Sequence, residues 1–207
     1  RKNPFWYRIL NKVWKSTYPL GTCTRLEKDD LIRSARKITG LTDLGKDFWD
    51  EPLDRLLRSV NGEADLHPAG RFITKQRFTS LLSIRMRAEH YFKKHPEILE
   101  QELYPAWIIV GLQRTGTTKL ERLLAVDPDH RVIPSWEVIN PVPLDPGLYD
   151  QRGVYPSPKD KRIAVANTSV KALKLISPGF FAVHPIDVFQ PEEDILLLDI
   201  SFLSTTP

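Results

Sequence analysis

The chain has 207 residues, of which 41% are hydrophobic and 27% are charged, and it carries a formal net charge of +4. This composition is typical of a globular protein and excludes an intrinsically disordered chain. Its one cysteine, Cys23, cannot form an internal disulfide and suits a reducing compartment, so we expect the cytoplasm. No apolar run is long enough to span a bilayer. The positive charge favours an anionic ligand, but no motif of a nucleic-acid-binding protein accompanies it, so we expect no nucleic-acid partner.

Residues 5–18 form an amphipathic pattern near the start of the sequence. On a helix, their aromatic and aliphatic side chains would share one face, with basic residues off that face. Such a helix can lie in a membrane interface, or it can pack on the protein itself or on a partner chain. The sequence leaves these alternatives open, peripheral membrane contact included.

Three further helices are predicted within the first half of the chain. One runs from Asp29 to Gly40, because acidic residues favour a helix start and glycine favours a helix end. A second runs from Pro52 to Gly62 on similar signals, and a longer third runs from about Gly70 to Lys94. The third has six candidate core positions, which are Phe72, Ile73, Leu81, Leu82, Met86 and Phe92. We therefore predict a helical N-terminal region over residues 1–104.

The pattern changes after this region, where strand and helix signals alternate. Trp107–Val110 is an apolar strand candidate that leads through a glycine-containing loop into a helix. Arg131–Ile133 is a second strand candidate, and a strand–helix–strand unit implies a parallel sheet. We predict that residues 105–207 form the first part of an α/β domain, with a P-loop-like parallel sheet flanked by helices. A proline-rich loop over 140–158 and a helix over 159–177 are expected to follow.

The loop after the first predicted strand has the spacing of a phosphate-binding loop. Gly111, Gly116 and Thr118 match the pattern G-x-x-x-x-G-K-[ST], while Thr117 replaces its lysine. The two glycines allow backbone N–H groups to converge on one anion, and the following helix adds its own N–H groups and the positive end of its dipole. Without the lysine that reaches the β- and γ-phosphates, the loop suits one terminal phosphate better than a nucleoside triphosphate. Arg114 lies inside the loop, where charge would develop.

The same loop, Gly-Leu-Gln-Arg-Thr-Gly-Thr-Thr, resembles the 5′-phosphosulfate loop of sulfotransferases that use 3′-phosphoadenosine 5′-phosphosulfate (PAPS). It is most similar to the bacterial-type general branch, whose loop reads G-x-P-R-[ST]-G-T-T, although Gln113 replaces a usual proline and Lys119 a usual apolar residue. Further segments that resemble this family are residues 33–48, 95–99, 135–138, 141–143 and 191–194. The resemblance covers most of residues 25–207. It implies a longer catalytic domain whose 3′-phosphate site lies beyond Pro207.

The resemblance also implies roles for the loop residues. The 5′-phosphate of PAPS would be held by Gln113, Arg114, Thr115, Gly116, Thr117 and Thr118. Arg114 would in addition stabilise the departing phosphate, because a planar guanidinium can bind bridging and non-bridging oxygens together. The acceptor would be a hydroxyl group of a small molecule, a lipid or a sugar. This scheme requires no metal ion.

Two residues are candidates for the general base that deprotonates the acceptor. Glu137 follows the second predicted strand, and ligands bind at the carboxyl ends of parallel strands. Sulfotransferases with arginine in the loop use a glutamate at a similar place, which favours Glu137. His184 is the reserve candidate, since the other branch of the family uses a histidine base. The acidic residues 192–194 are predicted to start a helix rather than to bind a cation, because Pro191 precedes them.

Two other functions stay open on the sequence alone. A P-loop kinase or NTPase is one, since Ile195–Asp199 imitates a strand that ends in a magnesium-binding aspartate, although Thr117 in place of lysine weighs against phosphoryl transfer. The other is a non-catalytic scaffold that binds anions or membranes on the same fold, which residues 5–18 and Gln113 suggest.

Overall fold

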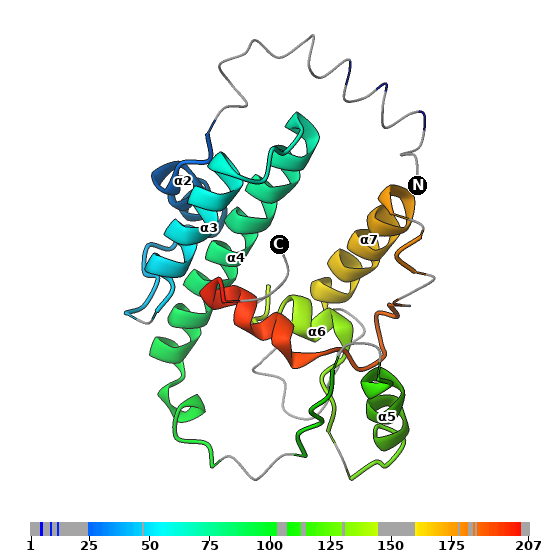
Figure 1. The fold of residues 1–207 in the computed structure, drawn as a ribbon. Helices are drawn as coiled ribbons and strands as arrows, with labels where there is room; N and C mark the ends of the chain where they lie inside the picture. Colours follow the sequence, from blue (N-terminus) through cyan, green and yellow to red (C-terminus); the bar gives the residue numbers. More distant parts are fainter. Residues whose placement is uncertain are drawn as a thin grey trace. The chain divides into compact units, whose positions relative to one another are not determined.

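The computed structural model describes residues 25–46, 48–102, 107–112, 115–129, 131–144, 160–177, 179–181, 184 and 186–203, together with Phe5, Ile9 and Lys12. Its α-helices are α2 (Lys28–Thr39), α3 (Asp50–Gly62), α4 (Pro68–Lys94), α5 (Thr117–Leu124), α6 (Ser135–Ile139) and α7 (Lys161–Ile176), shown in Figure 1. Two 3₁₀ helices are η1 (Pro96–Ile98) and η3 (Asp194–Ser201). No helix in the described part of the chain is long and apolar enough to cross a membrane.

The chain divides into two compact units. The first comprises Arg1–Lys94 and Asp199–Pro207, and the second comprises His95–Leu198. Of the amphipathic segment 5–18, only Phe5, Ile9 and Lys12 are described; they are helical and exposed, and the rest of that prediction lies outside the described residues. The division into domains predicted from the sequence stays a prediction.

In the first unit, α2 and α3 confirm the helices expected from their end signals. Asp29 and Asp30 lie in the first turn of α2, where carboxylates interact favourably with the positive end of the helix dipole. Gly40 ends α2 in the left-handed conformation (φ 70°), and its N–H donates to the carbonyl of Arg36. The proline-initiated helix also forms, as α3, with Pro52 in its first turn.

The core of the first unit lies where α2 packs against α3 and α4 (Figure 1). Its buried members are Leu26, Leu31, Ala35, Leu44, Leu53, Leu57, Phe78, Leu82, Met86 and Phe202. The ring of Phe202, which follows η3, meets that of Phe78 edge-on with a centroid distance of 5.8 Å. A segment from the end of the sequence therefore completes this core.

The predicted core positions on α4 are only partly correct. Leu82 and Met86 are buried, and Leu81 packs against the core. Phe72, Ile73 and Phe92 are exposed, so placing them in the core was wrong. The physical reason is length. α4 has 27 residues, and its contribution to the apolar core comes from the stretch between Phe78 and Met86, away from both ends.

The second unit is built around α6 and α7, which pack together. Trp136 of α6, Ala166 of α7 and Val188 form a small buried cluster. α7 confirms the helix predicted over residues 159–177. Asp160 caps its start by accepting a hydrogen bond from the N–H of Arg162 at 2.9 Å.

The segment around Val188 is fastened to the start of α6 by backbone hydrogen bonds. The N–H of Ser135 donates to the carbonyl of Gln190 at 2.9 Å, and the N–H of Trp136 donates to the carbonyl of Val188 at 3.1 Å. An isolated antiparallel bridge between Pro134 and Pro191 lies beside them. These contacts bring residues some fifty positions apart in the sequence to one place.

The two predicted strands do not form within the described residues. Residues 107–112 and 131–133 carry no strand assignment. The first segment is apolar yet exposed, with Trp107 at 72% and Val110 at 88% exposure. A strand exists only through hydrogen bonds to a neighbouring strand, and no described segment pairs with this one. The parallel sheet is therefore not confirmed and stays a prediction.

Candidate functional site

The loop before α5 has a closed geometry that depends on glycine. At Gly111, a Cβ atom would lie 2.9 Å from Thr115 Oγ1 and 2.9 Å from Thr117 Cγ2, so the loop leaves no room for a side chain. Gly116 precedes α5 with φ at 96°, a conformation that residues with a side chain rarely adopt. Residue 111 therefore lies close against the first turn of α5. Gln113 and Arg114 lie outside the described residues, and their roles stay predictions.

α5 directs its N-terminus at this loop. The N–H groups of Lys119 and Leu120 donate to the carbonyl of Gly116 and begin the helical hydrogen bonds. The N–H groups of Thr117 and Thr118 precede them and have no acceptor within the helix, so they are suited to an anion. The Thr115 hydroxyl donates to the carbonyl of Leu112 at 2.6 Å, which closes the loop in this conformation.

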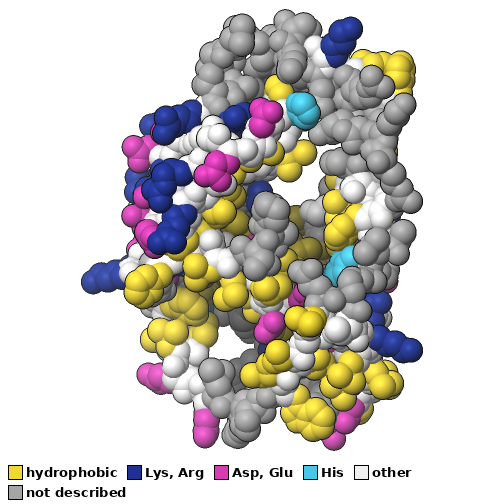
Figure 2. Space-filling model, in the orientation of Figure 1, with side chains coloured by type: hydrophobic (Ala, Val, Ile, Leu, Met, Phe, Trp, Pro, Cys, Tyr) yellow, Lys and Arg dark blue, Asp and Glu magenta, His cyan; other side chains and the backbone are white. Residues whose placement is uncertain are grey.

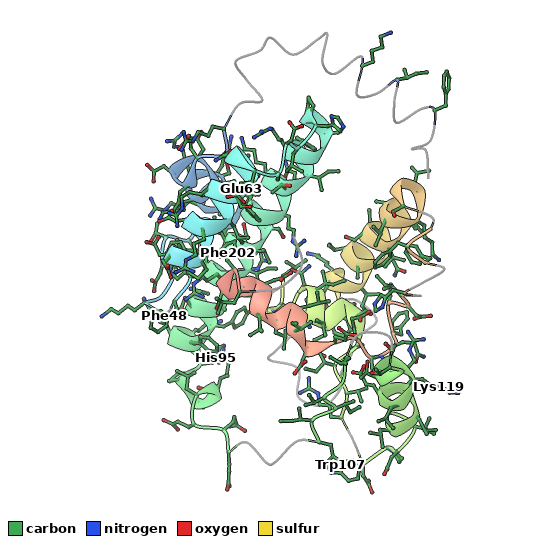
Figure 3. The ribbon with its side chains drawn as sticks, in the orientation of Figure 1. Phe48, Glu63, His95, Trp107, Lys119 and Phe202 are labelled. Carbon is green, nitrogen blue, oxygen red and sulfur yellow. The ribbon has the colours of Figure 1, made fainter. Side chains whose placement is uncertain are left out.

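The charges near α5 do not all favour an anion. Lys119 lies on the outer, solvent-exposed face of the helix (Figure 3). Burial raises the pKa of the Glu121 carboxyl above its ordinary value, and the negative charges of residues 192–194 raise it further, while Arg122 opposes both. The acidic segment therefore contributes negative potential at α5, which the N-terminal N–H groups must outweigh locally.

Glu137 occupies a buried position in the middle of α6. Its side chain is 11% exposed, and its Oε1 accepts a hydrogen bond from Arg131 Nη2 at 2.9 Å. Its Oε2 is buried and accepts no hydrogen bond in the described part of the structure. Leaving a buried polar atom unpaired costs about 1–3 kcal/mol, so such an atom calls for an explanation. Oε2 is thus the oxygen of Glu137 that has no hydrogen-bond donor among the described residues.

His184 belongs to a different arrangement in the same unit. Its Nε2 lies 3.2 Å from Oε1 of the buried Glu192, whose Oε2 is 3.5 Å from the Ser135 hydroxyl. Because Ser135 is the first residue of α6, these contacts connect His184 to the helix that carries Glu137. The predicted helix start at residues 192–194 is only partly right, since η3 begins at Asp194. Glu192 is instead held by the side chains of His184, 8 positions away in the sequence, and Ser135, 57 positions away.

A buried arginine that the sequence analysis missed lies at the other end of α6. Arg162 is 1% exposed, and its Nε and Nη2 donate to Asp160 at 3.0 and 2.7 Å. Its Nη1 donates to the carbonyls of Asn140 and Pro141 at 3.1 and 3.3 Å. Its guanidinium carbon lies 4.6 Å from the ring centroid of Trp136. The sequence signal was Asp160, which lies at the start of the helix predicted over residues 159–177.

The ionisation of Asp160 reflects this neighbour. Burial acts to raise the pKa of the Asp160 carboxyl, but the hydrogen bonds and positive charge of Arg162 outweigh it. The net result is a pKa below the ordinary value. The pair is therefore ionised over the whole neutral range.

The kinase interpretation requires a strand that ends at Asp199, and the structure contradicts that strand. Residues 194–201 form the 3₁₀ helix η3, and Asp199 Oδ2 accepts a hydrogen bond from Arg77 Nη2 at 2.6 Å. Asp199 is thus an ion-pair partner and does not end a strand. Across the described residues, no three His, Cys, Asp or Glu side chains are grouped so as to hold a metal ion.

Residues 105–206 match the family model for the "Sulfotransferase family". The structure is similar to that of sulfotransferase STF1 from Mycobacterium tuberculosis H37Rv, with a TM-score of 0.68 and 28% identity over 87% of this chain and 48% of that chain. It is also similar to sulfotransferase STF9 from Mycobacterium avium, with a TM-score of 0.67 and 25% identity over 91% of this chain and 46% of that chain. The chain thus spans about half the length of these two solved structures. No curated protein matches it.

Residues 105–206 therefore belong to the sulfotransferase family. This confirms the family inferred from the loop and its neighbouring segments, while the particular branch of the loop motif stays a prediction. Because the structural likenesses cover 87% or more of the chain, they extend into the helices of the first unit.

Proposed function

We propose that this chain is part of an enzyme that transfers the sulfonate group of PAPS to the hydroxyl of an acceptor. Family membership supports a transferase of sulfonate groups. The observation that carries the proposal is Glu137, because its Oε2 is buried and unpaired within the described structure, in the half of the chain that matches the family. PAPS as donor and the roles of individual residues are the parts that we propose.

The loop fits the 5′-phosphate end of PAPS. The absence of a side chain at Gly111 lets the backbone lie close against Thr115 and Thr117, and the N–H groups of Thr117 and Thr118 can donate to phosphate oxygens. When bound, PAPS supplies an activated sulfonate, whose sulfur–oxygen bond to the phosphate breaks as the acceptor oxygen bonds to sulfur. Arg114, known here from the sequence alone, would bind the phosphate oxygen on which negative charge collects.

Glu137 would accept the proton of the acceptor hydroxyl at Oε2. Arg131 holds the other oxygen at 2.9 Å and so limits rotation of the carboxylate. His184, the alternative base, is already paired with a buried carboxylate, that of Glu192, which favours Glu137 for the proton transfer. We propose the acceptor only as a hydroxyl compound, whether a small molecule, a lipid or a sugar.

The first experiment tests the nucleotide. The full-length protein is titrated calorimetrically with adenosine 3′,5′-bisphosphate without magnesium, with Arg114→Ala and Glu137→Gln beside the wild type. We expect saturable binding that Arg114→Ala weakens by about tenfold or more, which corresponds to about 1.4 kcal/mol, and that Glu137→Gln leaves unchanged. No binding by folded wild type, together with magnesium-dependent binding of ATP, would overturn the PAPS proposal in favour of a kinase.

The second experiment tests the chemistry. Sulfonate transfer from PAPS is measured with small alcohols, sugars and lipids as acceptors. Glu137→Gln is expected to lower kcat by about 100-fold or more, because an amide cannot accept the proton, and general-base catalysis contributes about 10²–10⁴-fold. If the wild type binds the nucleotide but transfers sulfonate to none of these acceptors, a non-catalytic anion-binding scaffold becomes the better explanation.

A further inference from the structure

α6 is too short to fix its own position. It has five residues, whereas isolated helices shorter than about 12–15 residues are marginal in water. Its start is fixed by the backbone bonds of Ser135 and Trp136 to the segment around Val188. Glu137 comes next, so the position of its carboxylate depends on how the other end of the helix is held.

Arg162 holds that other end. Its Nη1 donates to the carbonyls of Asn140 and Pro141, the two residues that follow α6. Its guanidinium also lies over the ring of Trp136, the residue directly before Glu137. These contacts lie on both sides of Glu137 in the sequence, and together with the bonds at Ser135 they restrain the whole helix.

Asp160 fixes the orientation of the guanidinium. It accepts from Nε and Nη2 of Arg162, and both side chains are buried. A buried ion pair is weak support for stability, because the cost of removing two charges from water offsets their attraction. The pair is better explained by the structure that it fixes, which here is the junction between α6 and α7.

We propose that Arg162 is a positioning residue for the base, acting through α6 to hold the Glu137 carboxylate where it meets the acceptor. The proposal rests on the function proposed for Glu137. Arg162→Lys tests it, because lysine keeps the charge but lacks the planar fork that reaches two carbonyls and a carboxylate together. A displacement of about 1 Å at a reacting group can cost about 100-fold in rate.

Arg85 provides a matched control in the first unit. It is buried, its Nε donates to the carbonyl of Leu44, and its guanidinium carbon lies 5.8 Å from the ring centroid of Trp49. Arg85→Lys therefore removes the same kinds of contact in the compact unit that does not contain Glu137. It reports what the substitution does by loss of stability alone.

Sulfonate transfer gives the first reading. Arg162→Lys should lower kcat by about 100-fold, while its Kd for adenosine 3′,5′-bisphosphate stays within about twofold of wild type. Arg85→Lys should leave both quantities within about twofold, measured at a temperature where all variants are folded. Asp160→Asn should lower kcat less than Arg162→Lys does. If Arg162→Lys does not fold, the comparison of kcat between Asp160→Asn and Arg85→Lys tests the proposal instead. Equal kcat for Arg162→Lys and Arg85→Lys, or a parallel loss of nucleotide affinity, would overturn the proposal.

Carboxyl ¹³C NMR gives a second reading that needs no activity. The Glu137 signal of protein labelled at the glutamate carboxyl carbons is identified by its absence in Glu137→Gln. Its chemical shift should change in Arg162→Lys and stay as in wild type in Arg85→Lys. That result with an inactive wild type would reject the proposed function and leave the positioning intact. An unchanged signal in Arg162→Lys would overturn the positioning, whatever the activity.

Discussion

Both compact units contain a buried arginine beside a tryptophan, but the surroundings differ. Arg85 lies in a unit whose apolar core has ten buried members, which come from α2, α3 and α4, from Leu26 and Leu44 outside these helices, and from the segment after η3. Arg162 lies beside a described cluster of three, Trp136, Ala166 and Val188. Apolar burial can therefore fix the helices of the first unit, and Arg85 fastens the loop at Leu44 to α4. In the second unit, hydrogen bonds and an ion pair must do much to fix the positions of α6 and α7.

The second unit also leaves much of its apolar surface uncovered in the described structure. Trp107, Ile108, Val110 and Leu112 are exposed, and on and after α5 so are Leu120, Leu123 and Val126. Figure 2 shows hydrophobic side chains on the surface over this part of the unit. The hydrophobic effect grows with the apolar area removed from water, so these residues add little to the stability of the described structure. The loop is thus shaped by glycine and local hydrogen bonds.

The largest expected effect is in the core of the first unit. Leu82→Ala should lower the free energy of unfolding by about 2–5 kcal/mol, because a fully buried leucine leaves a cavity when truncated. Leu123→Ala on α5, where the leucine is exposed, should change it by less than about 0.5 kcal/mol. Urea unfolding with hydrogen exchange resolved for each unit measures both. Equal losses would show that the second unit has a comparable apolar core.

Asp160→Asn is the corresponding change in the polar network. The folded state lowers the pKa of Asp160, so its ionised form stabilises the protein above the ordinary pKa, and that contribution disappears as pH falls through the folded pKa. Hydrogen bonds to charged groups contribute about 1.5–3 kcal/mol, and the variant should lose about this amount at pH 7.

The pH dependence provides the control for this substitution. The stability difference between wild type and Asp160→Asn should shrink as pH falls below about 4, since both then lack the carboxylate charge. Hydrogen exchange of the backbone amides in α6 and α7 measures this stability difference locally. A difference that does not depend on pH would mean that Asp160 acts through packing and not through its charge.

The sequence could predict the features that depend on interactions between residues close together in the chain. The ends of α2 could be predicted because Asp29, Asp30 and Gly40 act within one helical turn. The loop at Gly111 and Gly116 could be predicted for the same reason, since its geometry depends on residues that are close in the chain. Local chemistry is sufficient for both.

The rest depends on partners that no local pattern identifies. Glu192 is placed by Ser135, 57 positions away, and Arg162 by the carbonyl of Asn140, 22 positions away. α6 has five residues, too few to show a helical period, although Glu137 within it was identified by its position after a predicted strand. Trp107–Val110 has the composition of a strand, but composition does not supply the neighbouring strand that would pair with it.

Substitution of Glu121 has the smallest expected effect on stability. Its pKa is raised, whereas that of Asp160 in the same unit is lowered. Burial and then the acidic residues 192–194 raise its pKa, so the folded state favours the protonated carboxyl. The stability contributed by that proton is present below the ordinary pKa and is lost as pH rises through the raised one. Glu121→Gln should therefore raise the melting temperature at pH 7 relative to wild type and have little effect at pH 4. The gain should not exceed about 1 kcal/mol, because solvent screens a partly exposed group. Glu102→Gln, at an exposed position, is the control. If Glu121→Gln were destabilising at pH 7, the ionised carboxylate would be a favourable partner for Arg122, and the second unit would hold its carboxylates by pairing throughout.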